Sequence, residues 1–266
     1  MDKYCFGVDL GGTTVKIGLF SIEGQLQDKW EIPTRTENHG AEILSDIAAS
    51  IQRRMDTGHL SKEQVTGIGI GVPGPVLNEN IVQGCVNLGW GNVRVADELS
   101  ALTGLKVKAA NDANVAALGE QWQGGGKGFQ NLVMFTLGTG VGGGIIQNGR
   151  IISGANGAAG EIGHMVIVDS DEVVGTCGCG HRGCLEQVAS ATGIVNLTEK
   201  KLAECSQDSV LREISPLTAK DVLDAAKAGD ALAEQVAENM MKHLGRAAAY
   251  IACVVNPDIF VIGGGV

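Results

Sequence analysis

Proline and aromatic residues are both scarce in this chain of 266 residues, which has 5 prolines and an aromatic fraction of 4%. With so few rings, stacking platforms for nucleic-acid bases are not expected. Basic residues are also in the minority, because 20 Lys and Arg stand against 30 Asp and Glu, a net charge of -10. A chain this acidic argues against a general binder of nucleic acid or of anionic membranes.

Long hydrophobic runs and an export signal are missing as well. The longest apolar run, 247–255, is far too short to span a bilayer. The first residues, MDKYCFGVDLGG, contain no basic stretch followed by a long apolar region and a cleavage site. We therefore expect a cytoplasmic protein that has no membrane partner.

Glycine, in contrast, is abundant at 40 residues. Because hydrophobic residues make up 44% and charged residues 19%, a sizeable core can form and wholesale disorder is excluded. Glycine in excess with little proline is not a linker or collagen composition. It indicates a globular chain with many sharp bends or close approaches to a ligand.

Apolar runs separated by glycine-containing turns predict strands, and apolar residues at helical spacing predict helices. We expect strands at 4–9, 14–20, 26–32, 65–72, 105–110, 132–137, 142–147 and 258–262, and helices at 41–55, 93–103, 114–122, 219–228 and 231–255. Strands that lead through glycine turns into helices are typical of an α/β fold. The glycine-rich segment 124–128 is the best candidate for a hinge, and the strand–turn–strand unit after it echoes the beginning of the chain.

A glycine turn follows the first expected strand, in DLGGTTVK. Glycine amides can close on phosphate oxygens, threonine hydroxyls add donors and the lysine adds positive charge. The spacing is neither that of a Walker P-loop nor that of a dinucleotide fingerprint, and a plain tight hairpin is the alternative. The aspartate before the turn and the threonines after it favour phosphate binding. The candidate residues are Asp9, Gly11, Gly12, Thr13, Thr14 and Lys16.

A second loop of the same form, LGTGVGGG, connects the strands expected at 132–137 and 142–147. Two matching hairpins are hard to explain as accidental turns, and a facing pair would hold a triphosphate from both sides. The candidates in this loop are Gly138, Thr139 and Gly140.

Asn111 and Asp112 follow the strand expected at 105–110 and precede a helix. Ligands of α/β proteins bind beyond the carboxyl ends of such strands. Asp112 has two interpretations: an N-cap of the helix, or a carboxylate that accepts a proton from a substrate hydroxyl. The spacing alone favours the cap.

Three of the seven cysteines fall within eight residues, at Cys177, Cys179 and Cys184. This spacing indicates a metal site rather than a disulfide framework. Together with one imidazole the thiols make a Cys₃His zinc set, which leaves no open position and is therefore structural. His164 is the better fourth ligand, because His181 lies inside the loop; the alternative is three unconnected thiols.

Two carboxylates lie close in sequence to this cluster: Glu161 precedes His164, and Glu186 follows Cys184. They are either solvated surface charges or acceptors for the neighbouring hydroxyls of a sugar.

Taken together, these segments resemble the ROK family (repressor, open reading frame, kinase). The motifs that carry the resemblance, in chain order, are DLGGTTVK, PGP, NLGW, NDANVAALGE, LGTGVGGG, GEIGH, CGCGHRGCLE and VIGGGV. The match covers essentially the whole chain and is nearest to the members that phosphorylate glucose.

The resemblance implies an actin-like ATPase (ribonuclease H-like) fold of two lobes, at 1–113 and 114–266, with the ligand cleft between them. Members usually carry further helices after the last glycine run, so we expect ATP binding by a chain that ends at Val266 to be weak. Its partners are expected to be a sugar and a second copy of the chain, and its localisation cytoplasmic.

The resemblance also implies roles for individual residues. Asp112 matches the catalytic base, which overrides the capping interpretation. The first phosphate motif matches Asp9, Gly11, Gly12 and Thr13, the second matches Thr139 and Gly140, and the adenosine motif matches Gly264 and Gly265. The sugar-contacting positions are Asn87, Asn111, Glu161, His164 and Glu186. The structural zinc set is His164, Cys177, Cys179 and Cys184.

The expected activity is ATP- and Mg²⁺-dependent phosphorylation of glucose at its 6-hydroxyl. The alternatives are a kinase for another hexose or an N-acylhexosamine, such as N-acetylmannosamine, fructose or allose, or a sugar-responsive regulator. Regulators of this family carry a helix-turn-helix domain ahead of the sugar-binding region, for which the segment before Asp9 leaves no room.

Overall fold

The computed structural model describes residues 3–266, which divide into two compact units. The first unit is the chain as far as Gly119 together with Ser153–Ala159, and the second is Glu120–Ile152 together with Gly160–Val266. The sequence predicts units at 1–113 and 114–266. Residues 114–119 and 153–159 therefore belong to the first unit in the structure and to the second in that prediction.

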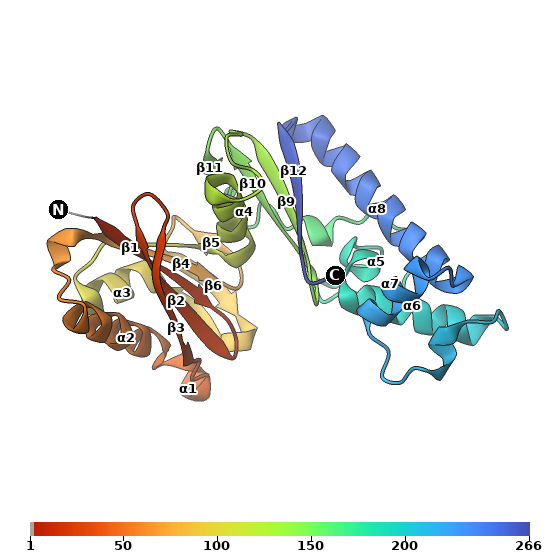
Figure 1. The fold of residues 1–266 in the computed structure, drawn as a ribbon, viewed down its shortest axis with the longest axis horizontal. Coiled ribbons are helices and arrows are strands. Elements are labelled where there is room, and N and C mark those ends of the chain that lie inside the picture. The colour runs from red at the N-terminus through yellow and green to blue at the C-terminus, as the bar shows by residue number, and fades with distance from the viewer. Residues whose placement is uncertain (1–2) are drawn as a thin grey trace. The chain divides into compact units, whose positions relative to one another are not determined.

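A five-stranded sheet forms the first unit (Figure 1). Its strands are β1 (Tyr4–Leu10), β2 (Thr14–Ser21), β3 (Leu26–Pro33), β4 (Val65–Val72) and β8 (Val107–Asn111). They lie in the order β3-β2-β1-β4-β8; β2 runs antiparallel to both β3 and β1, whereas β1, β4 and β8 run parallel to one another. The carboxyl ends of β1 and β8 therefore lie at the same edge of the sheet.

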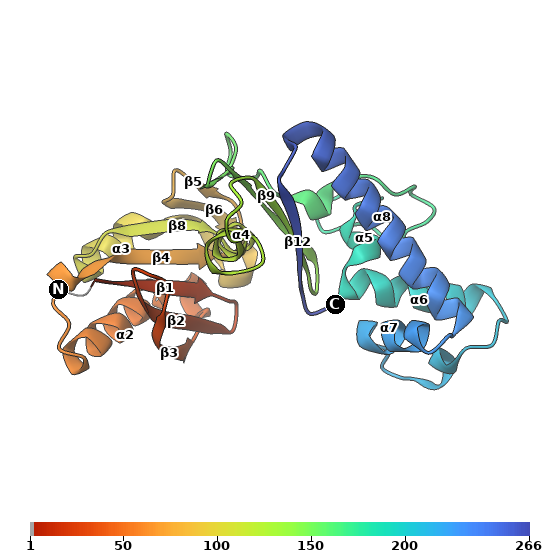
Figure 2. The same cartoon turned by 45° about the horizontal axis from the view of Figure 1, so that its top comes forward.

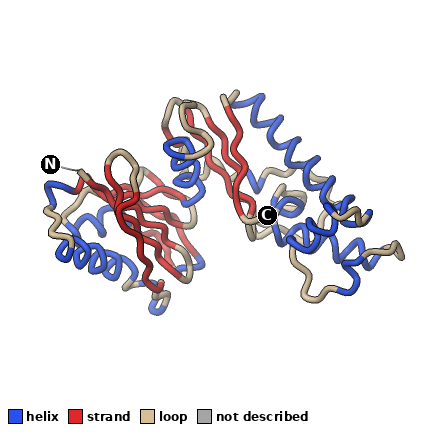
Figure 3. Tube along the Cα trace, viewed as in Figure 1, coloured by secondary structure: helices blue, strands red, loops and turns tan. Residues whose placement is uncertain are grey.

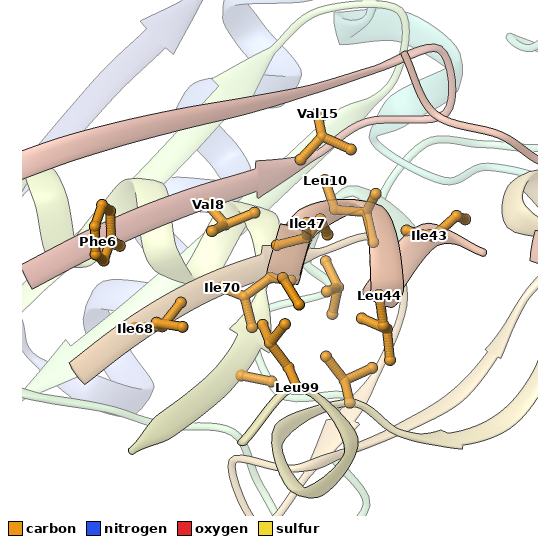
Figure 4. Packing of buried hydrophobic residues seen from close by; sticks show 14 of the residues in the cluster. Phe6, Val8, Leu10, Val15, Ile43, Leu44, Ile47, Ile68, Ile70 and Leu99 are labelled. Atoms are coloured by element: carbon orange, nitrogen blue, oxygen red, sulfur yellow. The ribbon is translucent and has the colours of Figure 1, made fainter. Parts of the chain in front are cut away.

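Two helices pack on this sheet, α2 (Ile43–Thr57) and α3 (Val95–Thr103), and the four-residue α1 (Glu37–Gly40) precedes them. Phe6, Val8 and Leu10 are buried at every second position of β1, as expected for a strand with one face on the core. On α2 the buried stripe includes Ile43 and Ile47, at helical spacing. Figure 4 shows these side chains meeting in the core.

A small antiparallel sheet in the first unit is not expected from the sequence. It consists of β5 (Val76–Leu77), β6 (Ile81–Cys85) and β7 (Trp90–Arg94). Val93 pairs with Val82 across β6 and β7, so the helix expected to begin at 93 begins at Val95. Helix α4 (Asp112–Gln123) follows β8.

The second unit contains a four-stranded sheet in the order β11-β10-β9-β12. Figure 3 draws these strands in red. Its strands are β9 (Leu132–Leu137), β10 (Val141–Gln147), β11 (Arg150–Ile151) and β12 (Ile259–Gly264). Because β9 and β12 run parallel, Gly264 pairs with Leu137 at the end of the sheet where the second glycine loop begins.

Four helices complete the second unit (Figure 2). They are α5 (Glu186–Ala189), α6 (Ala191–Glu204), α7 (Ala219–Lys227) and α8 (Ala231–Val255). Side chains of Ser190, Thr218 and Asp230 accept hydrogen bonds from backbone amides at the starts of α6, α7 and α8. Short 3₁₀ turns connect other elements: η1 (Lys62–Gln64), η2 (Val86–Leu88), η3 (Ile162–His164) and η4 (Val210–Glu213).

Within residues 3–266, none of the helices combines the length and the apolar character needed to cross a bilayer. All seven cysteines lie in this part of the chain, and all are free thiols.

Candidate functional site

The first glycine loop is the turn between β1 and β2. The amide of Gly11 donates to the carbonyl of Thr14 over 3.1 Å, and a Cβ at Gly11 would lie 2.9 Å from that oxygen. Thr34 fixes the loop from outside, because its hydroxyl donates to the Gly11 carbonyl (2.7 Å) and its amide to the Thr13 carbonyl (2.9 Å). The loop is thus a fixed, glycine-dependent turn with exposed residues Gly12 and Thr13 at its tip.

Three further candidates of the first unit lie around this loop. A Cβ at Gly12 would be 3.9 Å from the Cβ of Asn87, whose residue is exposed. Asp9 is the next-to-last residue of β1 and Asp112 follows β8, and the two carboxylates are close enough to interact electrostatically. The structure therefore brings Asp9, Gly12, Asn87 and Asp112 to one edge of the sheet.

The carboxyl of Asp112 has a raised pKa. Surrounding protein atoms partly desolvate it and raise the pKa above the ordinary 3.8, and the negative charge of Asp9 acts in the same direction. A hydrogen bond from the Ala113 amide (2.8 Å) opposes this shift only in part. Because the residue stays exposed at the surface, the carboxyl is accessible to a ligand.

Asn111, not Asp112, caps helix α4. The amide of Asn114 donates to Asn111 Oδ1 over 3.2 Å, three residues on, as an N-cap requires. Asn111 Nδ2 donates to the Gly74 carbonyl over 3.3 Å, so both ends of this side chain are engaged within the protein. The capping interpretation of Asp112 from spacing is thus wrong by one residue. The Asp112 carboxylate does not form the N-cap hydrogen bond of α4.

The predicted metal ligands of the second unit come together. One ligand atom each from His164, Cys177, Cys179 and Cys184 lies within 4.8 Å of the others. His164 comes from η3, and the three thiols come from the loop before α5. Three thiols and one imidazole are a donor set that suits tetrahedral Zn²⁺, and Cys177 and Cys184 are buried, so the residues fit a structural metal.

The imidazole of His164 has its two nitrogens turned to different partners. Nδ1 lies 3.4 Å from Cys177 Sγ, and Nε2 lies 4.0 Å from Glu161 Oε2. The ring therefore connects the thiol cluster with one of the predicted sugar-contacting carboxylates. His181 Nδ1 also lies 3.5 Å from Cys179 Sγ, at the exposed side of the cluster.

The thiols of the cluster differ in acidity. Hydrogen bonds from the backbone and side chain of His181 lower the pKa of Cys179 to about 6, whereas burial raises the pKa of Cys184 to about 12. Metal affinity at such a cluster depends on pH, because the thiols must lose their protons to bind the metal.

The second glycine loop, Gly138–Gly140, joins β9 to β10 in the second unit. It closes on itself through a hydrogen bond from the Gly138 amide to the Gly140 carbonyl (3.0 Å). The predicted adenosine residues are its neighbours, because the amide of Gly265 donates to the Leu137 carbonyl over 2.8 Å. A Cβ at Gly264, where φ is +123°, would lie 2.0 Å from that same carbonyl oxygen.

Glu186 lies between this loop and the thiol cluster. Its Oε2 accepts a hydrogen bond from the Val141 amide (3.0 Å), and its Oε1 lies 3.7 Å from Cys177 Sγ. A Cβ at Gly140 would lie 2.3 Å from Oε2, so the loop packs directly against the end of this side chain. The structure thus joins Glu186 to both features that the sequence singles out in this unit.

Sequence reasoning missed two residues that hold these loops. The side chain of Gln187 accepts from the amides of Gly183 and Cys184 and donates to the carbonyls of Val174 and Gly175. Thr192 donates to the carbonyl of Thr139. The sequence held one signal for Thr192: Ser190 is a favourable N-cap residue and marks the start of α6. This helix was not predicted from the sequence.

Comparison with known proteins shows the family to which this chain is similar. The ROK family profile matches residues 5–266. A glucokinase from Halalkalibacterium halodurans is 44% identical over 269 residues, which cover 100% of this chain and 81% of that protein. Two similar crystal structures are a ROK hexokinase from Thermus thermophilus (28% identity, TM-score 0.81, 100% and 82% of the two chains) and a ROK glucokinase from Streptomyces griseus in complex with glucose and AMPPNP (31%, 0.73, 98% and 83%).

The fold is therefore the actin-like ATPase fold of ROK sugar kinases. This confirms the fold class expected from the sequence. The chain belongs to the ROK family, as its motifs indicate.

Proposed function

We propose that this chain transfers a phosphoryl group from ATP to the 6-hydroxyl of glucose. The observation that carries the proposal is the 44% identity to a glucokinase along the whole chain. It is supported by the Asp112 carboxylate, which is accessible and has a raised pKa.

In the first unit, Asp112 accepts the proton of the attacking sugar hydroxyl. A carboxyl with a raised pKa is a better proton acceptor, provided that it is ionised at the working pH. The turn residues Gly11, Gly12 and Thr13 hold phosphate oxygens through amides and a hydroxyl. Asp9 and its neighbours would hold Mg²⁺, which neutralises charge on the triphosphate when it is bound.

In the second unit, Glu161, His164 and Glu186 hold sugar hydroxyls, and Thr139 and Gly140 hold phosphate oxygens. The Cys₃His set would hold Zn²⁺, which supplies structure and orients the His164 ring through Nδ1, leaving Nε2 for a sugar hydroxyl. Gly264 and Gly265 lie beside Leu137, as residues of the adenosine motif next to a phosphate loop should.

A coupled-enzyme assay across sugars tests this function. ADP release is measured with glucose, fructose, allose and N-acetylmannosamine, at equal concentrations and with saturating MgATP. We expect the highest kcat/KM for glucose. A higher value for N-acetylmannosamine would reassign the substrate, and no release with any sugar would refute a sugar kinase.

We also propose a cytoplasmic homodimer, which follows from the family resemblance. Light scattering during gel filtration measures the mass in solution. A mass near twice 27.5 kDa would support the dimer, and a mass near 27.5 kDa would refute it.

A further inference from the structure

Three hydrogen bonds attach the second glycine loop to the segment that follows the thiol cluster. The amide of Ala191 donates to the Gly138 carbonyl (2.8 Å), and the Thr192 hydroxyl donates to the Thr139 carbonyl (3.0 Å). The third runs from the Val141 amide to Glu186 Oε2 (3.0 Å). Gly138 and Thr139 of the loop are thus bound to the first turn of α6, and the first residue of β10 is bound to α5.

The same segment begins at the metal cluster. Only Leu185 separates the ligand Cys184 from Glu186, and α5 spans the four residues from Glu186 to Ala189. Gln187 fixes this helix to the metal-binding loop, since it bonds both the Gly183 amide (2.9 Å) and the Val174 carbonyl (3.1 Å). A displacement of the metal-binding loop must therefore move α5.

A cavity of about 220 Å³ lies where the two loops meet. Its walls include Thr139 and Gly140 from the glycine loop, Cys177 from the metal cluster, and Glu186 and Thr192 from the connecting segment. The glycine loop packs against the carboxylate of Glu186, since a Cβ at Gly140 would lie 2.3 Å from Oε2. The two loops are therefore coupled by contact as well as by hydrogen bonds.

We propose that Thr192 is a positioning residue for the nucleotide, and that with Glu186 and the Ala191 amide it couples the second phosphate loop to the metal-binding loop. The proposal rests on the proposed function in assigning nucleotide phosphates to this loop. Metal binding then orders the phosphate loop, and by reciprocity a nucleotide bound at the loop raises the affinity for the metal.

Thr192→Val tests the coupling because it keeps the shape of the side chain and removes only the hydroxyl. Thr192→Ser keeps the hydroxyl and should behave as the wild type. Thr66→Val is the matched control, since Thr66 is also exposed and its hydroxyl donates to a carbonyl, that of Tyr4, in the first unit.

Two readouts are measured on the zinc-loaded full chain. The first is amide hydrogen exchange in peptides that cover 132–147, which we expect to be faster in Thr192→Val than in the other variants. The second is steady-state kinetics, in which we expect the KM for ATP to rise about 2- to 10-fold, the effect of one neutral hydrogen bond, while the KM for glucose changes less than the KM for ATP.

A third readout tests the reciprocal coupling. Zinc affinity is measured by equilibrium competition with a chromogenic chelator, with and without a non-hydrolysable ATP analogue. The analogue should raise the zinc affinity of the wild type and raise it less in Thr192→Val.

The outcomes separate the coupling from the activity. Exchange and ATP KM in Thr192→Val that match those of Thr66→Val would overturn the coupling, even if the enzyme phosphorylates glucose. Faster exchange in 132–147 together with no phosphorylation of any sugar by the wild type would support the coupling of the two loops and refute the proposed function.

Discussion

At the scale of single residues, Asn111 at the end of β8 and the adjacent Asp112 have different partners. Asn111 accepts the bond from the Asn114 amide and so caps α4, while the side chain of Asp112 accepts a bond from the adjacent Ala113 amide. An aspartate that capped the helix would have its acceptor capacity directed to the backbone. Because Asn111 caps the helix, the Asp112 carboxylate is not needed for that role, which agrees with the catalytic role that we propose for it.

Replacing Asp112 with asparagine should separate chemistry from structure. Asn keeps the size and most hydrogen bonds of Asp but cannot accept the proton of the sugar, so we expect kcat to fall about 10²- to 10⁴-fold. Glucose binding by calorimetry and zinc content should stay close to those of the wild type.

Asp97→Asn is the matched control, because Asp97 lies in the first turn of α3 and outside the proposed site. It should keep near-normal kcat. Near-normal kcat in Asp112→Asn would return this residue to a structural role.

The raised pKa of Asp112 predicts a pH dependence of both activity and stability. The protonated carboxyl cannot accept a proton, so kcat/KM should fall as the pH drops through a value above 3.8. Since the folded-state pKa lies above that of the unfolded chain, ionisation of Asp112 destabilises the fold, and Asp112→Asn should raise the melting temperature at pH 7.

The gain should vanish below a pH of about 4, where the carboxyl is protonated in both states. Melting curves of both proteins between pH 4 and 8 check this sign. A variant less stable than the wild type at pH 7 would contradict it.

At the scale of elements, the metal-binding loop has few hydrophobic anchors apart from its own thiols. Residues 174–176 and 178–182 are all exposed, while Cys177 and Cys184 are buried. The free energy of binding a structural metal is folding free energy for such a loop. Cys179→Ala should therefore lose zinc and several kcal/mol of stability, although Cys179 itself is exposed.

Elemental analysis of desalted protein and thermal melting measure both effects. Cys253→Ala is the matched control, because Cys253 is also exposed and lies on α8 outside the cluster. It should retain one zinc per chain. A desalted wild type without zinc would remove the basis of the prediction.

Elements with their own periodicity could be predicted, and those that depend on partners far along the chain could not. Strands β1, β2, β9 and β10 are apolar runs between glycine turns, and α8 carries a long apolar stripe and the N-cap Asp230. The strands β5, β6 and β7 are short and lack a distinctive pattern, so only pairing with one another defines them.

The candidate site divides in the same way. The thiols are close in sequence, so their grouping follows from spacing. The hydrogen bond from Thr192 to Thr139 joins residues 53 positions apart, and no sequence pattern in either segment predicts it. The cap at Asn111 depends on which of two adjacent polar residues has the right backbone conformation, which composition alone does not decide.

At the scale of the whole molecule, the buried side chains form two separate cores. One contains residues between Phe6 and Ala109, the other residues between Val133 and Ile251, and they share no member. Because the metal cluster belongs to the second unit, a chelator should lower the unfolding temperature of that unit and leave the first unit unchanged.

Calorimetry of the chelated protein should therefore show two transitions. Hydrogen exchange on heating would assign the first of them to the second unit. A single transition that shifts as a whole on chelation would show that the two cores unfold as one cooperative system.

The segment Ser153–Ala159 belongs to the first unit although the chain on both sides of it belongs to the second. It is tightly held there, because a Cβ at Gly157 would lie 2.5 Å from the Val76 carbonyl oxygen. A protease that nicks the chain once in the glycine-rich stretch 124–128 would therefore leave two fragments that remain associated. The fragments should elute together in native gel filtration and separate in denaturant. Each unit consists of two separate stretches of the chain, so neither unit can be expressed from one uninterrupted stretch of the gene.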